Sequence, residues 1–215
     1  MIKAVIFDMD GTIIDSMPLW THVGSDYLNS LGIAPKPGLD DKIFYMNISQ
    51  FIEYVKQQYS LNDTSEKIYD DINCQIIENY KDVKDKPGAI KLLKCLKKLG
   101  IILILATASS RQIAESVLTR LSMWQLFDKH YCDIKKSKPD IFYEIAKSAG
   151  LHTYECCVAE DTVLPAENAK AAGMKILGVH DAVTQKYSKS MKEVSDLYYD
   201  TLENTDSIIN EIIKM

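Results

Sequence analysis

Two aspartates stand two residues apart near the start of the chain, directly after a short apolar run. Ala4 to Phe7 has the composition of a strand buried on both faces of a sheet, and the run stops at Asp8. An extended backbone aims the side chains of Asp8 and Asp10 the same way, and Gly11 lets the chain turn without a Cβ in the site. Ligands bind at the carboxyl ends of strands in open α/β sheets, so this carboxylate pair indicates nucleophilic, acid–base or metal chemistry.

Two plainer interpretations of this acidic segment exist. A calcium loop counted from Asp8 needs a Glu at its twelfth position, where the sequence has Leu19. A solvated acidic turn after a strand stays open on the segment alone, because short motifs of this kind are common. The apolar strand in front of Asp8 favours a buried site.

Candidate reactive residues also follow two later apolar runs of the chain. They are Thr107, Ala108 and Ser109 after residues 101–106, and Glu160 and Asp161 after residues 156–159. A parallel sheet would bring Asp8, Thr107 and Asp161 together at one edge, although they are far apart in the sequence. Taken singly, such hydroxyls can simply cap helices and such acids can occupy turns.

Helices and buried strands alternate from residue 84 onward, which predicts an α/β fold with a Rossmann-like, three-layer core around a parallel sheet. Apolar spacing predicts helices over 89–99, 111–121, 139–149 and 165–172, a terminal helix around 208–213, strands over 101–106, 156–159 and 175–179, and a further strand near 130–133. Ser109 and Gln112 resemble a capping box for the helix that starts at Arg111.

Residues 15–83 contain no convincing strand. Apolar residues recur at helical spacing over 16–31, 48–59 and 68–80. We therefore expect an α/β core domain of residues 1–14 and 84–215 and an inserted helical bundle of residues 15–83. Lys86-Pro87-Gly88 has the composition of a hinge at which the chain re-enters the core.

The composition argues against several classes of function. Lys+Arg 25 against Asp+Glu 30 give a net charge of −5, and the only arginines are Arg111 and Arg120, so a binding surface for a nucleic-acid polymer is not expected. The N-terminus lacks the zones of a signal peptide and the apolar runs are strand-length, so we expect a soluble, cytoplasmic protein without membrane contact. Five cysteines without a Cys-x-x-Cys pair argue against a disulfide framework or a zinc site. We expect a monomer or weak dimer.

The segment Asp8-Met9-Asp10-Gly11-Thr12 resembles the first motif of the haloacid dehalogenase superfamily, most of whose members are magnesium-dependent phosphohydrolases. The resemblance covers most of the chain: Thr107 falls at the second motif, Lys136-Ser137-Lys138-Pro139-Asp140 is similar to the third, and Glu160-Asp161-Thr162 is similar to the fourth. The sequence departs from the family at Ser137, where a proline is usual, and at Pro165, where a glycine is usual.

The resemblance implies a role for each of these residues. Asp8 would attack phosphorus to form an aspartyl-phosphate, and Asp10 would act first as general acid and then as base. Lys136, rather than Lys138, would be the catalytic lysine, because Pro139 anchors the register of the motif. The implied phosphoryl-binding residues are Thr107, Ala108, Ser109 and Lys136, and the implied Mg²⁺ site comprises Asp8, Asp10, Glu160 and Asp161.

The helical insert lies between the first and second motifs, which resembles the C1-capped branch of the superfamily. Such a cap would close over the site and select the leaving alcohol, with Asp15-Ser16 and Val83 to Lys86 as candidate hinges. The implied activity is hydrolysis of small phosphorylated metabolites such as sugar phosphates or nucleotides.

Two alternatives to this phosphatase hypothesis are kept. β-Phosphoglucomutases share the cap type and the core, and they hold their sugar phosphate partly with a cap arginine and a histidine. Residues 1–110 contain no arginine and Trp20 stands in the place of that histidine, so hydrolysis is favoured. A non-catalytic phospholigand-binding protein is disfavoured, because the nucleophile, the lysine and the metal acids are all present.

Overall fold

The computed structural model describes residues 1–43, 46 and 48–215, and these form two compact units. Met1–Asp15 and Val83–Met215 make up an α/β unit, and Ser16–Asp82 make up a helical unit. None of the helices in the described residues is both long enough and apolar enough to cross a membrane.

The α/β unit is built on a six-stranded sheet in the order β3-β2-β1-β4-β5-β6, and every adjacent pair is parallel. The strands are β1 (Ala4–Phe7), β2 (Ile102–Ala106), β3 (Lys129–Tyr131), β4 (Cys156–Glu160), β5 (Lys175–Val179) and β6 (Leu197–Tyr199). The fully buried β1 lies between β2 and β4, with Phe7 opposite Leu105 and Ala159. The loops that follow these three strands therefore leave the sheet at one edge. The Rossmann-like α/β prediction is confirmed.

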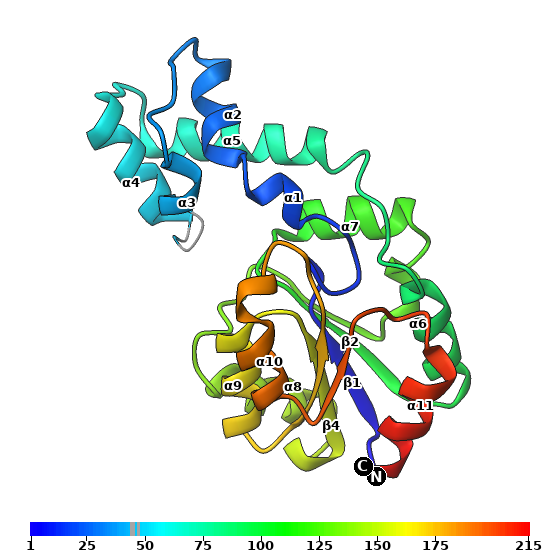
Figure 1. Cartoon of the computed structure of the whole chain (residues 1–215). Coiled ribbons are helices and arrows are strands. Elements are labelled where there is room, and N and C mark those ends of the chain that lie inside the picture. The colour runs from blue at the N-terminus through cyan, green and yellow to red at the C-terminus, as the bar shows by residue number, and fades with distance from the viewer. Residues whose placement is uncertain (44–45, 47) are drawn as a thin grey trace. The chain divides into compact units, whose positions relative to one another are not determined.

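Helices cover both faces of this sheet, which gives the three layers visible in Figure 1. One face carries α8 (Asp140–Ser148), α9 (Val163–Ala171) and α10 (Ser188–Val194), and the other carries α6 (Ala89–Lys98) and α11 (Thr205–Lys214). On the first face, Ile6 and Val158 from the strands share one buried core with Phe142 of α8. The remaining elements of the unit are α7 (Arg111–Arg120), η1 (Trp124–Leu126), η2 (Thr153–Glu155) and η3 (Gln185–Tyr187).

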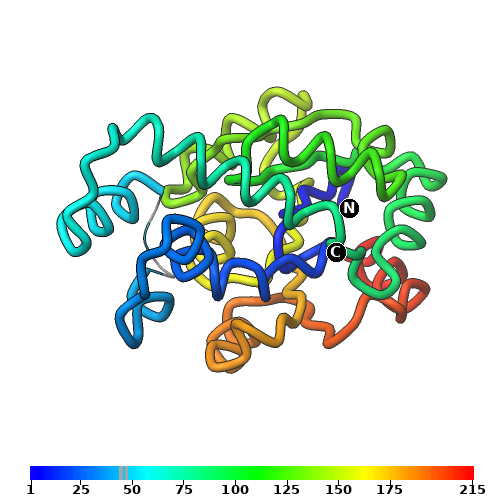
Figure 2. Tube along the Cα trace, turned by 90° about the horizontal axis from the view of Figure 1, so that it is seen from above, coloured from blue at the N-terminus to red at the C-terminus, as the bar shows by residue number. Residues whose placement is uncertain are grey.

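The two chain ends lie side by side in both views (Figures 1 and 2), and Figure 1 shows them near the end at which the chain enters β1. The candidate residues thus lie at the opposite, carboxyl ends of the strands.

Strand β6 and helix α10 escaped the sequence-based prediction. All three residues of β6 are only partly buried, and the strand lies at the sheet edge beside β5, so it lacks the apolar run of a central strand. Helix α10 is seven residues long and buries only Met191, so it shows no recurring apolar stripe.

The segments where the chain leaves and re-enters the α/β unit are paired with each other. The N–H of Asp15 donates to the Lys84 carbonyl at 2.9 Å, and the N–H of Lys86 donates to the Ile13 carbonyl at 3.0 Å. Farther along, Gly88 has a φ of 87°, and a Cβ there would lie 2.3 Å from the backbone carbon of Leu202. The Lys86-Pro87-Gly88 segment therefore lies anchored within the α/β unit.

The helical unit contains α1 (Met17–Trp20), α2 (Val23–Ser30), α3 (Leu39–Ile43), α4 (Ile48–Tyr59) and α5 (Ser65–Asn79). The prediction of one helix over 16–31 was wrong, because the chain breaks between α1 and α2. There the hydroxyl of Thr21 donates to the Pro18 carbonyl at 2.6 Å, a side-chain bond that competes with a continuing helix. Within this unit the indole N–H of Trp20 donates to the Tyr80 hydroxyl at 2.9 Å.

Candidate active site

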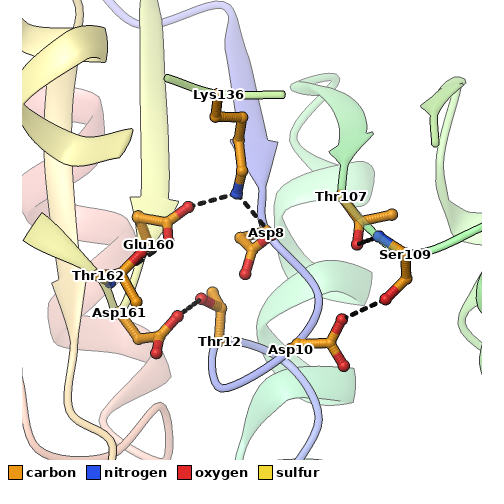
Figure 3. A network of polar contacts seen from close by, with 9 residues as sticks. All are labelled: Asp8, Asp10, Thr12, Thr107, Ser109, Lys136, Glu160, Asp161 and Thr162. Carbon is orange, nitrogen blue, oxygen red and sulfur yellow. Dashed lines mark hydrogen bonds and ion pairs between the residues drawn. The ribbon is translucent and has the colours of Figure 1, made fainter. Parts of the chain in front are cut away.

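The predicted site residues come together at the carboxyl edge of the sheet, within the α/β unit (Figure 3). The loop after β1 carries Asp8 and Asp10, the loop after β2 carries Thr107, Ala108 and Ser109, the end of β4 carries Glu160 and Asp161, and the loop before α8 carries Lys136. Parallel pairing of β1 with both neighbours is what unites these distant segments.

Lys136 binds two carboxylates at once. Its Nζ lies 2.6 Å from Oδ1 of Asp8 and 2.6 Å from Oε2 of Glu160, and all three side chains are buried. Lys138, the other lysine of the motif, is exposed. The ammonium thus bridges the ends of β1 and β4.

The buried cluster of Asp8, Glu160, Asp161 and Lys136 contains more acidic than basic side chains. Oxygens of Asp8, Glu160 and Asp161 all lie within 4.8 Å of one another, and Lys136 is the cation in contact with them among the described residues. Burial, reinforced by Glu160, raises the pKa of Asp8 to about 8 against the opposing effect of Lys136. Burial and Glu160 also raise the pKa of Asp161 well above its ordinary value.

The same crowding holds the lysine in its charged form. Burial alone would lower the pKa of Lys136, but the charges of Asp8 and Glu160 outweigh burial and raise it. One ammonium faces three carboxylates, so a further positive charge would relieve the remaining repulsion.

The oxygens of the two adjacent β4 acids differ in how they are bound. Glu160 is engaged on both sides, since Oε2 binds Lys136 and Oε1 accepts from the N–H and the hydroxyl of Thr162 at 3.3 and 2.6 Å. Oδ1 of Asp161 accepts from the hydroxyl of Thr12 at 3.1 Å, whereas its buried Oδ2 has no hydrogen-bond partner in the described part of the chain.

This donor set fits a hard divalent cation. Carboxylate oxygens are the ligands that such ions prefer, and a buried carboxylate oxygen without a partner is costly unless it gains one. Asp8 and Asp161 suit direct ligation, while the oxygens of Glu160 are already occupied by Lys136 and Thr162.

Ser109 joins the loop after β2 to the loop after β1. Its hydroxyl donates to Oδ2 of Asp10 at 2.7 Å, and its N–H donates to the hydroxyl of Thr107 at 3.0 Å. The predicted capping box was wrong, because Ser110 is the N-cap of α7 and accepts from the Ile113 N–H at 3.4 Å. Ser109 is thereby left to contact Asp10.

Three residues of the site were missed as functional candidates in the sequence. Thr12 and Thr162 stand inside the first and fourth motifs, so their hydroxyls beside acids were visible as a signal. Asn168 on α9 donates from Nδ2 to the backbone carbonyl of Lys136 at 3.0 Å. Its signal was an amide in the middle of an alanine-rich helix.

Comparison with known proteins then decides the family. The family model described as haloacid dehalogenase-like hydrolase matches residues 5–179. The chain belongs to this family. Hexitol phosphatase B from Escherichia coli K12 is a relative that is 28% identical over 187 residues, covering 83% of this chain and 83% of the relative.

Further relatives point the same way. A phosphorylated carbohydrates phosphatase from Thermotoga maritima is 27% identical over 195 residues, with 82% of this chain and 85% of the relative covered. The solved β-phosphoglucomutase from Clostridium difficile superposes with a TM-score of 0.76 at 22% identity, covering 100% of this chain and 98% of that one. The likeness to this solved structure is a likeness of fold alone.

Proposed function

We propose that this haloacid dehalogenase-like hydrolase is a Mg²⁺-dependent phosphatase of small phosphorylated metabolites such as sugar phosphates, acting through an aspartyl-phosphate at Asp8. The observation that carries the proposal is the buried Asp8 carboxylate, 2.6 Å from the Lys136 ammonium and beside Asp161. Relatives that are named phosphatases of hexitols and of phosphorylated carbohydrates support the substrate class.

Asp8 is the proposed nucleophile. An oxygen of its carboxylate forms a bond to phosphorus while the ester bond between phosphorus and the substrate oxygen breaks. Lys136 holds Asp8 in place through its 2.6 Å contact and offsets the repulsion between a carboxylate and a phosphate dianion. Glu160 in turn fixes the lysine from its other side.

Asp10 is the proposed general acid and base. In its protonated form it gives a proton to the departing alkoxide, and the alcohol leaves. The Asp10 carboxylate then takes a proton from water, whose oxygen attacks phosphorus and breaks the bond to Asp8, releasing inorganic phosphate. The hydroxyl of Ser109, 2.7 Å from Oδ2 of Asp10, keeps this carboxyl oriented.

The remaining positive charge would come from Mg²⁺ held by Asp8, Asp161 and the carbonyl of Asp10, which when bound supplies charge neutralisation of the phosphoryl oxygens. Thr107 and the backbone N–H groups of Ala108 and Ser109 belong to the loop before α7, where an anion is favoured. We assign this loop to the transferring phosphoryl group.

We further propose that the helical unit, Ser16–Asp82, is the cap that selects the leaving alcohol. In the mutase alternative, a cap arginine and a histidine at position 20 would help to hold the sugar phosphate. Trp20 offers only an indole N–H, which already donates to Tyr80.

A phosphorus NMR time course with magnesium tests the activity on a panel of hexose phosphates, hexitol phosphates and nucleotides, including β-glucose 1-phosphate with a trace of its bisphosphate. Inorganic phosphate from one or a few members is the expected result, and Asp8→Asn should abolish it. Glucose 6-phosphate without free phosphate would establish the mutase alternative instead. No turnover across the panel would favour either a substrate outside the panel or a non-catalytic phospholigand-binding protein.

The covalent step has its own readout. Borohydride reduces an acyl phosphate, so quenching during turnover should convert Asp8 to homoserine in a peptide identified by mass spectrometry. Modification at another carboxylate would contradict the assignment of the nucleophile.

A further inference from the structure

The segment that carries Lys136 has few backbone anchors. Before it, the Asp133 and Ile134 N–H groups donate to the Ser109 and Thr107 carbonyls at 3.0 and 3.2 Å. From Lys135 to Lys138, the Lys136 carbonyl is the one backbone group with a hydrogen bond within the part of the chain that the structure describes. Its donor is the side-chain amide of Asn168, at 3.0 Å.

This single bond acts at the base of a long side chain. Four methylenes separate the Lys136 backbone from an ammonium that must meet Asp8 and Glu160, each at 2.6 Å. Ordering a lysine side chain costs rotamer entropy, and a loose backbone would add to that cost. Fixing the carbonyl of Lys136 fixes the point from which the side chain starts.

Asn168 is suited to this task by its helix. Helix α9 begins two residues after Asp161, so Asn168 is carried by the element that directly follows the β4 acids. Its neighbours Ala166 and Ala169 are fully buried, while Asn168 itself is partly buried. Asparagine is a poorer helix former than alanine, so its presence inside this alanine-rich helix calls for a contact outside the helix.

We propose that Asn168 is a positioning residue that, through its hydrogen bond to the Lys136 carbonyl, sets the Lys136 ammonium between Asp8 and Glu160. The proposal rests on the phosphatase function proposed above. The bond links the loop that carries Lys136 to helix α9, which follows Glu160 and Asp161. It thereby holds Lys136 at a fixed distance from these two acids.

The test compares Asn168→Ala, Asn168→Asp and the control Glu167→Ala, which changes an exposed neighbour on the same helix. Asp keeps the size of Asn, but a carboxylate cannot donate to the Lys136 carbonyl. With magnesium and p-nitrophenyl phosphate, both Asn168 variants should lose about tenfold in kcat while KM changes less than about twofold. Glu167→Ala should match the wild type, and wild-type kcat in Asn168→Asp would overturn the proposal.

Native-state proteolysis tests the hydrogen bond between Asn168 and the Lys136 carbonyl without any measurement of activity. Trypsin can cleave after Lys135 and Lys136, and mass spectrometry identifies this nick among all others. The nick should form several times faster in Asn168→Ala than in Glu167→Ala, at equal thermal midpoints. Unchanged nicking together with unchanged kcat would overturn the proposal.

Different results would contradict the phosphatase function and the positioning role of Asn168. A wild-type protein without turnover on any phosphate ester would contradict the phosphatase function, and the trypsin rates would still decide whether Asn168 anchors the loop. An active wild type with active, slowly nicked Asn168 variants would contradict Asn168 alone.

Discussion

The Nζ atom of Lys136 lies 2.6 Å from Oδ1 of Asp8, although 128 positions separate the two residues in the chain. The same ammonium reaches Glu160, so it joins the ends of two adjacent parallel strands. One buried cation thus stands against three buried carboxylates, which makes the charge balance of this edge the quantity that substitutions and metal should change.

Replacing Lys136 by Met should strongly destabilise the metal-free protein, because Asp8 and Glu160 would stay buried without their cation. Removing one partner of a buried ion pair costs about 3–5 kcal/mol. Urea unfolding with EDTA at pH 9, above the pKa of about 8 of Asp8, measures the free energy of unfolding with this carboxyl ionised. Adding Asp8→Asn to Lys136→Met should recover part of the loss, because it removes one of the uncompensated carboxylates. Equal stability of wild type and Lys136→Met would contradict this charge balance.

Magnesium should raise the thermal unfolding midpoint through Asp161. An ion at 100 times its Kd stabilises a folded protein by about 2.7 kcal/mol if it binds that state alone. Asp161→Asn should lose most of this response, since the partnerless Oδ2 would become part of a neutral amide. Asp181→Asn is the matched control, because Oδ2 and Oδ1 of Asp181 already bind Lys86 and the Val183 N–H at 2.7 and 2.8 Å. If magnesium still raised the thermal midpoint of Asp161→Asn by the same amount, the ion would have to bind elsewhere.

Thr12 should set magnesium affinity, because its buried hydroxyl orients Asp161 from 3.1 Å. Loss of such a supporting hydrogen bond typically weakens metal binding by about 10–100-fold. Thr12→Val should therefore raise the magnesium concentration for half-maximal activity or thermal shift, and Thr12→Ser should restore it. Thr162→Val, which changes a contact of Glu160, should move this concentration less.

The central strands and the motif positions could be predicted because their signals are local. A strand buried on both faces must be an apolar run, and β1 shows this in the four residues Ala4–Phe7. The parallel arrangement then places the loop after each strand at one edge, so the meeting of Asp8, Thr107 and Asp161 could be inferred from their order alone.

The hydrogen bonds inside the site could not be predicted, because they depend on the packing of separate loops. Ser109 and Ser110 are equally good caps in sequence, and only the approach of Asp10 assigns one to the site and the other to α7. Likewise Asn168 is a weak helix residue whose partner lies 32 positions away. The edge strand β6 was missed for a related reason, since partial burial leaves no apolar run.

Asp128 should give the protein a pH-dependent increment of stability. Its Oδ1 pairs with Lys97 at 2.7 Å and its Oδ2 accepts from the Leu103 N–H at 2.9 Å, which ties the start of β3 to β2. Burial alone would raise the pKa of Asp128, but the bonds from Lys97 and Leu103 outweigh burial and lower it from 3.8. A carboxyl with a lowered pKa contributes stability that is fully present above pH 3.8 and lost as the pH falls through the lowered pKa.

Asp128→Asn should therefore lower the free energy of unfolding at neutral pH by less than about 1 kcal/mol, because the side chain is partly exposed. The difference from wild type should shrink as the pH falls below 3.8, where the wild-type carboxyl itself becomes neutral. Urea unfolding from pH 7 to pH 3 measures this, with Lys97→Ala as the matched variant that removes the partner charge. Because both variants break the same pair, both differences should decline together. A difference that stays constant over this range would mean that Asp128 contributes through shape and not through its charge.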